Sequence, residues 1–216
     1  SHLGPELNVE EDIDELHRNG AVMVRIDDDE LFECVADLLA DEMIIGWVQG
    51  RMEFGPRALG ARSILGDPRV SDMQSRMNLK IKFRESFRPF APAVLEEHAA
   101  DCFEFNGSVS SPYMLSTHYV KESRRLENDA EVQGIDRVKQ IRSDLPSITH
   151  LDYSARVQTV DADRHPRFHQ LLLAFHQRTG CPVLINTSFN VRGEPIVRTA
   201  SDAYRCFMAT HMDALV

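Results

Sequence analysis

The stretch Cys181-Pro-Val-Leu-Ile-Asn-Thr-Ser-Phe-Asn-Val-Arg-Gly-Glu-Pro195 decides how this chain folds. Its first half holds the aliphatic and β-branched run Pro182 to Ile185, which is typical of a buried strand, and its second half ends in a Gly-Glu-Pro turn. The strand therefore brings three small polar side chains to a rim just before the turn, namely Asn186, Ser188 and Asn190. Hydroxyl and amide groups at that rim can bind an anion, while the ordinary role of such residues is to cap a turn.

Strand and helix patterns alternate along the rest of the chain. Helices are expected at Val9 to Arg18, Asp27 to Leu39, Ser71 to Lys80, Arg164 to Arg178 and Ser201 to His211, the last with a cap from Thr199 and Asp202. Strands are expected at Ala21 to Ile26, Met43 to Gln49, Phe90 to Leu95, Tyr113 to Val120, Arg156 to Val160 and Met212 to Val216. This alternation predicts an α/β sheet with helices packed on it. The charged segment Glu122 to Gln133 lacks a period and is expected to be a mobile surface loop or insertion.

The length and composition fit one large domain. With 216 residues, 43% of them hydrophobic, the chain can bury a sizeable core. Residues 1–20 are expected to form an N-terminal linker and helix that begins with a tag remnant, Ser1-His2, and residues 21–216 to form the domain. The last residues form a strand pattern with no turn after it, which suggests a domain taken from a longer protein.

Charge and cysteine usage exclude several classes of protein. A formal net charge of -10 argues against a nucleic-acid or anionic-membrane surface, because such partners are held by exposed Lys and Arg. No apolar run approaches the roughly 20 residues that cross a bilayer. The cysteines are scattered without a C-x-x-C pair and are expected to be reduced core thiols of a cytosolic protein, at Cys34, Cys102, Cys181 and Cys206.

Two basic segments stand out against this acidic background. Residues 50–65 (GRMEFGPRALGARSIL) follow a predicted strand, where ligands bind in α/β sheets, and an arginine fork suits phosphate or carboxylate. The structural alternative pairs Arg57 and Arg62 with Glu53 and Asp67. Residues 80–88 (KIKFRESFR) set cations among apolar side chains, which strengthens phosphate binding through a lower effective dielectric. Their alternative is a solvated helix end, and Arg156 could be a satisfied structural cation.

Other kinds of chemistry find little support. His165 and His169 have the spacing of a helical metal pair, but no third ligand is in view, so a solvated helix face is preferred. No Gly-x-Ser-x-Gly elbow is present for acyl-enzyme chemistry. Catalysis by positioning and charge neutralisation is the better interpretation.

Three stretches together resemble the C-terminal domain of the O-carbamoyltransferases, which include the nodulation-factor and antibiotic carbamoyltransferases: residues 50–65, Asn78 to Val94 and Leu184 to Ile196. The resemblance implies a YrdC-like fold, a twisted mixed α/β sheet with packed helices. It also implies a reaction in which carbamoyl phosphate is cleaved to carbamate, which attacks the α-phosphate of ATP to give carbamoyl adenylate and pyrophosphate.

The family reaction brings further partners. Mg²⁺ is expected to accompany ATP, and a separate N-terminal actin-like domain with a metal site is expected to pass the carbamoyl group to a substrate hydroxyl. Within this chain no metal ligand is expected. A non-catalytic nucleotide-binding or regulatory YrdC-like module remains the alternative.

The resemblance also implies roles for single residues. Lys82 and Arg88 would bind phosphate groups, and Arg156 would neutralise charge on the α-phosphate or carbamate. Asn186 with Ser188 would hold the carbamoyl and phosphate oxygens. The remaining members of the predicted nucleotide-binding set are Arg57 and Asn190.

Overall fold

The computed structural model describes residues 1–127 and 134–216. Among them, six strands form a mixed sheet in the order β7 (Gln158–Val160), β3 (Ala91–Leu95), β8 (Val183–Ser188), β2 (Arg62–Gly66), β1 (Ile45–Val48) and β9 (Ala214–Leu215). A smaller antiparallel sheet contains β4 (Phe103–Glu104), β5 (Thr117–Val120) and β6 (Ser154–Arg156). The prediction of an α/β architecture with a mixed sheet is confirmed.

The strand β8 lies in the interior of the large sheet, as its aliphatic run predicts. It pairs antiparallel with β2 on one side and with β3 on the other. Val183, Leu184 and Ile185 are fully buried. Each such side chain stabilises the fold by roughly 1.5–3 kcal/mol relative to exposure. The central position of β8 therefore follows from its hydrophobicity on both faces.

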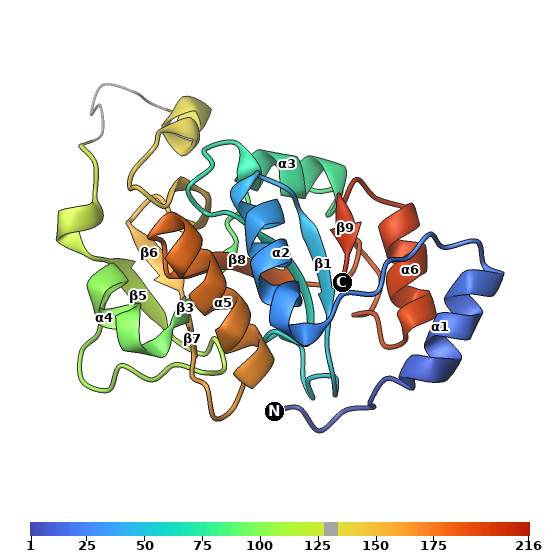
Figure 1. Ribbon diagram of the computed structural model, residues 1–216. Coiled ribbons are helices and arrows are strands. Elements are labelled where there is room, and N and C mark those ends of the chain that lie inside the picture. Colours follow the sequence, from blue (N-terminus) through green and yellow to red (C-terminus); the bar gives the residue numbers. More distant parts are fainter. Residues whose placement is uncertain (128–133) are drawn as a thin grey trace.

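The helices surround this sheet. In Figure 1, α2 (Asp28–Ala40) and α5 (Pro166–Thr179) lie side by side over one face, while α1 (Val9–Arg18) and α6 (Ala200–Met208) lie together at one end. The predicted cap of α6 is confirmed, because Thr199 and Asp202 form a reciprocal capping box. The remaining helical segments are α3 (Met73–Lys80), α4 (Ala99–Cys102), and the short 3-10 turns η1 (Glu96–His98), η2 (Glu122–Arg124), η3 (Gly134–Lys139) and η4 (Pro146–Ile148).

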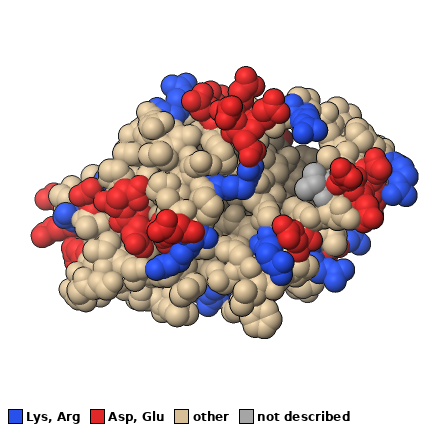
Figure 2. Space-filling view, turned by 60° about the horizontal axis from the view of Figure 1, so that its bottom comes forward, with Lys and Arg blue, Asp and Glu red and all other residues tan. Residues whose placement is uncertain are grey.

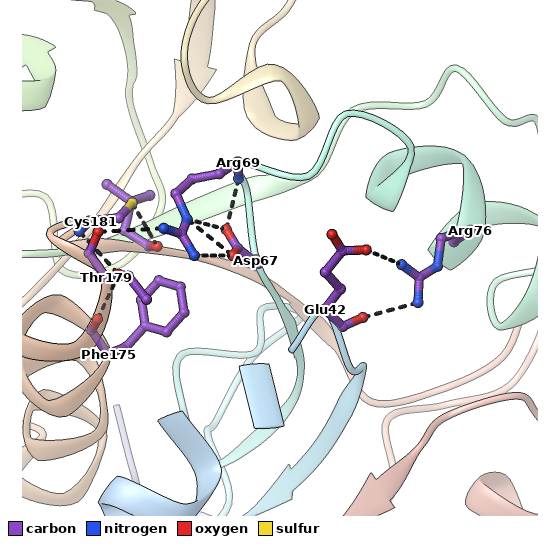
Figure 3. A network of polar contacts seen from close by, with 8 residues as sticks. Glu42, Asp67, Arg69, Arg76, Phe175, Thr179 and Cys181 are labelled. Atoms are coloured by element: carbon purple, nitrogen blue, oxygen red, sulfur yellow. Dashed lines mark hydrogen bonds and ion pairs between the residues drawn. The ribbon is translucent and has the colours of Figure 1, made fainter. Parts of the chain in front are cut away.

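An ion pair just after β2 connects this strand to the end of α5. Asp67 is almost fully buried and accepts hydrogen bonds from the Arg69 guanidinium, the shortest at 2.6 Å. The same guanidinium lies 5.4 Å from the centre of the Phe175 ring and donates to the Thr179 carbonyl at 3.4 Å (Figure 3). Asp67 therefore forms its ion pair with Arg69, and not with Arg57 or Arg62 as the structural alternative suggested.

Three strand predictions need correction. Of the predicted strand Tyr113 to Val120, only the second half is a strand, β5. Residues 21–26 form no strand: Val22 is 99% and Val24 82% exposed, so this apolar run passes over the surface without a β partner. The run from Arg156 to Val160 is not one strand, because it leaves the small sheet after β6 and joins the large sheet at β7. The break lies at Val157, which is fully buried.

One strand was not foreseen in the glycine-rich segment. The first four residues of β2 lie at the end of residues 50–65, which the sequence presents as a loop after a strand, and all five residues of β2 are buried. The segment Glu122 to Gln133 begins with the turn η2, and Arg125 forms an isolated β-bridge with Ser143. Residues 128–133, on which the rest of that loop prediction falls, lie outside the described residues.

Most of the cysteines lie where the sequence predicts them, as free thiols in the core. Cys102, Cys181 and Cys206 are buried free thiols, as expected of core cysteines, whereas Cys34 is only partly buried. Burial raises the pKa of Cys181 to about 12, which leaves this thiol unreactive. In the part of the chain that the structure describes, no helix has the length and apolar character that a membrane span requires.

The tight turn before β2 gives a test of the fold. Gly60 has φ +108°, and a Cβ built on it would lie 2.3 Å from Cδ1 of Phe168. We expect Gly60→Ala to lower the free energy of unfolding by about 1–3 kcal/mol more than Gly55→Ala does, because overpacking adds to the backbone strain. Gly55 is the matched control, since its φ of +133° is also strained but nothing lies within 4 Å. Urea unfolding measures both, and equal losses would contradict the packing role.

Candidate functional site

Four chain segments meet at one end of the large sheet, and the strand directions explain why. β2 and β3 run antiparallel to β8, so the loops that precede them lie at the carboxyl end of β8. β7 runs parallel to β3, which places Arg156, just before β7, at the same end. The rim formed by Asn186 to Ser188 therefore faces three loops.

A cavity of about 180 Å³ opens where these segments meet. Its wall contains Arg57, Arg84 and Arg156, together with Pro56, Ala58, Pro89, Phe90, Ala91, Met114, Asn186, Thr187 and Ser188. We call this cavity the arginine pocket. No carboxylate is among these lining residues, although the chain as a whole is acidic.

The electrostatics of the arginine pocket favour an anion. Burial and the nearby Arg88 lower the pKa of Arg84 to about 10. Burial, and then repulsion from Arg57, lower the pKa of Arg156. The Nε of Arg156 is buried and has no hydrogen-bond partner among the described residues. Such a group is satisfied when a ligand oxygen accepts from it.

The surface charge puts this pocket in context. In Figure 2 acidic side chains form several clusters over the visible face, and basic side chains lie between them. A net charge of -10 would repel a phosphate at long range. Anion binding therefore depends on the local concentration of guanidinium groups, which act at short range in a partly desolvated wall.

A buried carboxylate shapes the loop that holds Arg57. Glu53 is 4% exposed, and its Oε1 accepts hydrogen bonds from the backbone N–H of Leu59 at 2.6 Å and of Ala61 at 2.7 Å. The proposed pairing of Arg57 with Glu53 is therefore not what the structure shows. Arg62, fully buried, donates to the backbone carbonyls of Gln49, Gly50, Ala61 and Arg198.

Asn78 arranges the second loop in the same way. Its Nδ2 donates to the carbonyls of Ser86 at 3.1 Å and Arg88 at 2.7 Å, and its Oδ1 accepts from Nε of Arg84 at 2.5 Å. The Arg84 guanidinium also lies 4.9 Å from the centre of the Phe90 ring. Arg84 was not singled out from the sequence, although it belongs to the basic segment that was.

The amide of Asn186 is held from behind by Gln158, a residue that the sequence analysis missed. Asn186 Nδ2 donates to Gln158 Oε1 at 2.7 Å and to the Ala58 carbonyl at 3.2 Å. Gln158 is fully buried at the start of β7. Its spacing from Arg156 gave no valid signal, because the two residues lie in strands of different sheets.

Lys82 lies behind the rim and outside the lining of the arginine pocket. Its Nζ donates to the Ser188 carbonyl, to the Asn190 carbonyl at 2.9 Å and to Asn190 Oδ1 at 2.9 Å. Ser188 Oγ also donates to Asn190 Oδ1, at 2.7 Å. Burial, and less strongly Arg84, lower the pKa of Lys82 to about 7. In this arrangement Lys82 fixes the end of β8.

The structure thus brings part of the predicted set together. Arg57, Arg156, Asn186 and Ser188 line one pocket, and Lys82 with Asn190 supports it from behind. Arg88 is exposed and is not in the lining, although it is close enough to affect Arg84. The individual roles that the resemblance implies stay predictions.

Histidines and acids do not gather as a metal centre requires. No group of three His, Cys, Asp or Glu side chains that could hold a metal ion occurs within residues 1–127 and 134–216. His165 is buried against His2, with ring centres 4.6 Å apart, so the expectation of a solvated face is wrong at this residue. His169 Nε2 lies 2.9 Å from Glu97 Oε1.

Comparison with known proteins places the chain in a family. Residues 36–216 match the family model described as Carbamoyltransferase C-terminus. The nodulation protein NolO of Bradyrhizobium diazoefficiens is 44% identical over 189 residues, which are 87% of this chain and 31% of that protein. The 3'-hydroxymethylcephem-O-carbamoyltransferase of Amycolatopsis lactamdurans is 40% identical over 164 residues, 76% of this chain and 27% of that protein. The chain therefore spans less than a third of the length of both relatives.

A solved structure shows the same fold. Full-length HypF in its phosphate- and nucleotide-bound form superposes with a TM-score of 0.54 at 15% identity, and covers 86% of this chain and 24% of that chain. At this identity the likeness concerns the fold alone. It confirms the predicted YrdC-like α/β architecture.

The lowered pKa of Lys82 predicts a pH dependence of stability. Between about pH 7 and 10.5 the unfolded chain binds the Lys82 proton and the folded chain does not, so the free energy of unfolding rises with pH in this window. The rise is at most about 1.4 kcal/mol per pH unit and is absent below pH 7. Urea unfolding of the wild type and Lys82→Met at pH values from about 6 to 9 isolates this contribution. Parallel curves for the two proteins would contradict it.

Proposed function

The chain belongs to the carbamoyltransferase C-terminal family, and from this premise we propose that it forms carbamoyl adenylate from carbamoyl phosphate and ATP. The arginine pocket is the observation that supports the proposal most directly. Three guanidinium groups without a lining carboxylate suit a ligand with several negative charges. In a longer O-carbamoyltransferase, the part of the protein outside this chain would pass the carbamoyl group to a hydroxyl.

The proposed chemistry needs cations more than it needs a proton-transfer group. Carbamoyl phosphate would first be hydrolysed to carbamate and inorganic phosphate. The carbamate oxygen then forms a bond to the α-phosphorus of ATP while the bond to pyrophosphate breaks. Two anions must approach each other, and negative charge builds up on the phosphoryl oxygens in the transition state. Arg57, Arg84 and Arg156 would offset this repulsion from fixed positions, which costs no reorganisation during the reaction.

Mg²⁺ is proposed as the ion that accompanies ATP. ATP can carry Mg²⁺ through its own phosphate oxygens, so the proposal asks for no dedicated set of protein ligands. When bound, Mg²⁺ would neutralise part of the phosphate charge. The side chains of this chain would then orient the nucleotide and exclude water from the reactive carbamate.

A second cavity offers room for the nucleoside. The arginine pocket, at about 180 Å³, is small for a whole nucleotide, which needs a site of several hundred Å³. A cavity of about 720 Å³ shares Pro89 with it, so the two are neighbours. Its lining includes the half-exposed apolar side chains of Phe87, Ile141 and Leu151. We propose that adenosine binds there with its phosphates directed toward the arginines.

Removing an arginine tests the reaction. We expect Arg57→Ala and Arg156→Ala to reduce pyrophosphate release from ATP and carbamoyl phosphate at least about 100-fold, because each variant loses a cation at the transition state. A coupled pyrophosphate assay on the 216-residue chain with Mg²⁺ measures this. Arg178→Ala is the control, since this exposed arginine pairs with Asp37 on α2 at 2.7 Å.

The outcomes separate the candidate functions. Release that persists in both pocket variants would overturn the site assignment. ATP binding by the wild type, without turnover at any carbamoyl phosphate concentration, would favour the nucleotide-binding module instead.

Phe87 tests the nucleoside site. We expect Phe87→Ala to raise the KM for ATP about 10-fold, because the base would lose an aromatic face, and to leave the KM for carbamoyl phosphate within about two-fold. Tyr119→Ala is the control, because Tyr119 is about as exposed but lies on β5 and not in the cavity lining. Steady-state kinetics measure both constants, and an unchanged KM for ATP would place the nucleoside elsewhere.

A further inference from the structure

The orientation of the Asn186 amide is fixed by two neighbours. Gln158 Nε2 donates to the Leu59 carbonyl at 2.9 Å, which leaves Gln158 Oε1 as an acceptor for Asn186 Nδ2. The same Nδ2 also donates to the Ala58 carbonyl. Turning either amide by 180° would set oxygen against oxygen or leave a donor without an acceptor. Nδ2 is therefore directed away from any ligand.

This arrangement leaves an acceptor unused in the wall of the arginine pocket. Asn186 is 1% exposed, and its Oδ1 is buried without a hydrogen-bond partner among the described residues. A buried acceptor of this kind is costly unless a donor reaches it. Arg156 Nε has the opposite need, since it is a buried donor without an acceptor. A ligand that satisfies both must carry anionic oxygens and an N–H or O–H group.

Carbamoyl phosphate combines these features. Its phosphate and carbonyl oxygens accept hydrogen bonds, and its amino group donates two. Acetyl phosphate has nearly the same shape but replaces the amino group with a methyl group, which leaves the Asn186 acceptor unpaired. Sites built to hydrogen-bond a polar substituent reject an analogue that lacks it.

We propose that Asn186 Oδ1, oriented by Gln158, accepts a hydrogen bond from the carbamoyl amino group and so selects carbamoyl phosphate over acetyl phosphate. This inference rests on the proposed function. It changes the role expected for Asn186, which contacts the nitrogen side of the carbamoyl group and not its oxygens. Gln158 is a positioning residue, because it acts through Asn186.

Calorimetry with three ligands tests the selection. The 216-residue chain is titrated at low temperature with fresh carbamoyl phosphate, acetyl phosphate and inorganic phosphate. We expect the wild type to bind carbamoyl phosphate about 10- to 100-fold more tightly than acetyl phosphate, the range for one unsatisfied buried acceptor. In Gln158→Met, which cannot orient the Asn186 amide, we expect a ratio below about three and inorganic phosphate affinity within about two-fold of the wild type.

Thr159→Val provides a matched control. Thr159 is the neighbouring buried residue of β7, and its Oγ1 donates to Glu96 Oε2 at 2.8 Å outside the arginine pocket. This variant removes that hydrogen bond and the one that Thr159 Oγ1 accepts from the backbone N–H of Ser111 at 2.8 Å, but should keep the wild-type ratio. A loss of the ratio in both variants would overturn the specific role of Gln158.

The wild-type ratio requires no variant and decides the inference even if Gln158→Met fails to fold. Equal affinity for carbamoyl and acetyl phosphate, with inorganic phosphate still bound, would overturn the selection by Asn186 and leave the proposed function intact. Failure of all three ligands to bind would overturn both. The expected ratio, retained in Thr159→Val, supports the inference.

Discussion

The antiparallel pairing of β8 with β2 and β3 is the interaction on which the rest of this structure depends. A strand between two antiparallel neighbours meets the start of each neighbour at its own carboxyl end. The two loops that contain Arg57 and Arg84 are therefore placed beside Asn186 by the sheet itself, and not by contacts between the loops. Glu53 and Asn78 then fix the loop backbones through hydrogen bonds to backbone groups. The rigid sheet sets the distances, and two buried polar side chains set the orientations, which is the arrangement that an electrostatic site requires.

Two arginines of this chain differ in their surroundings. Arg62 is buried and donates to four backbone carbonyls, so its charge supports the turn between β1 and β2. Both keep a buried nitrogen without a hydrogen-bond partner among the described residues, Nη2 in Arg62 and Nε in Arg156, but only Arg156 lines the arginine pocket with two other guanidinium groups. The lowered pKa of Arg156 expresses the free energy that burial and Arg57 cost the charged form. A bound anion would favour the charged form of Arg156 and would accept a hydrogen bond from its Nε.

Much of the fold could be predicted from residue patterns, and the errors have physical causes. β8 and α6 were predictable because an apolar run and a capping box act locally. The segment at residues 21–26 was not, because hydrophobicity alone does not say whether a partner strand exists; Val22 and Val24 remain exposed. Two of the three arginines that line the pocket, Arg57 and Arg156, and the polar rim were singled out from the sequence, whereas Arg84 was not. Gln158 and Asn78 were missed because their function is to hold other side chains, and only the three-dimensional pairing shows which groups they contact.

The segment from β6 to β7 passes from the small sheet to the large one, and this affects how firmly a bound ligand holds the two sheets together. Arg156 ends β6 of the small sheet, and Gln158 begins β7 of the large one, with buried Val157 between them. An anion that touches both Arg156 and the carboxyl end of β8 spans the seam between the sheets. Its binding free energy then adds to the cohesion of that seam, because any opening of the sheets must first release the ligand. The bound ligand would hold the two sheets together, and the resistance of their boundary to local unfolding would report on the occupancy of the pocket.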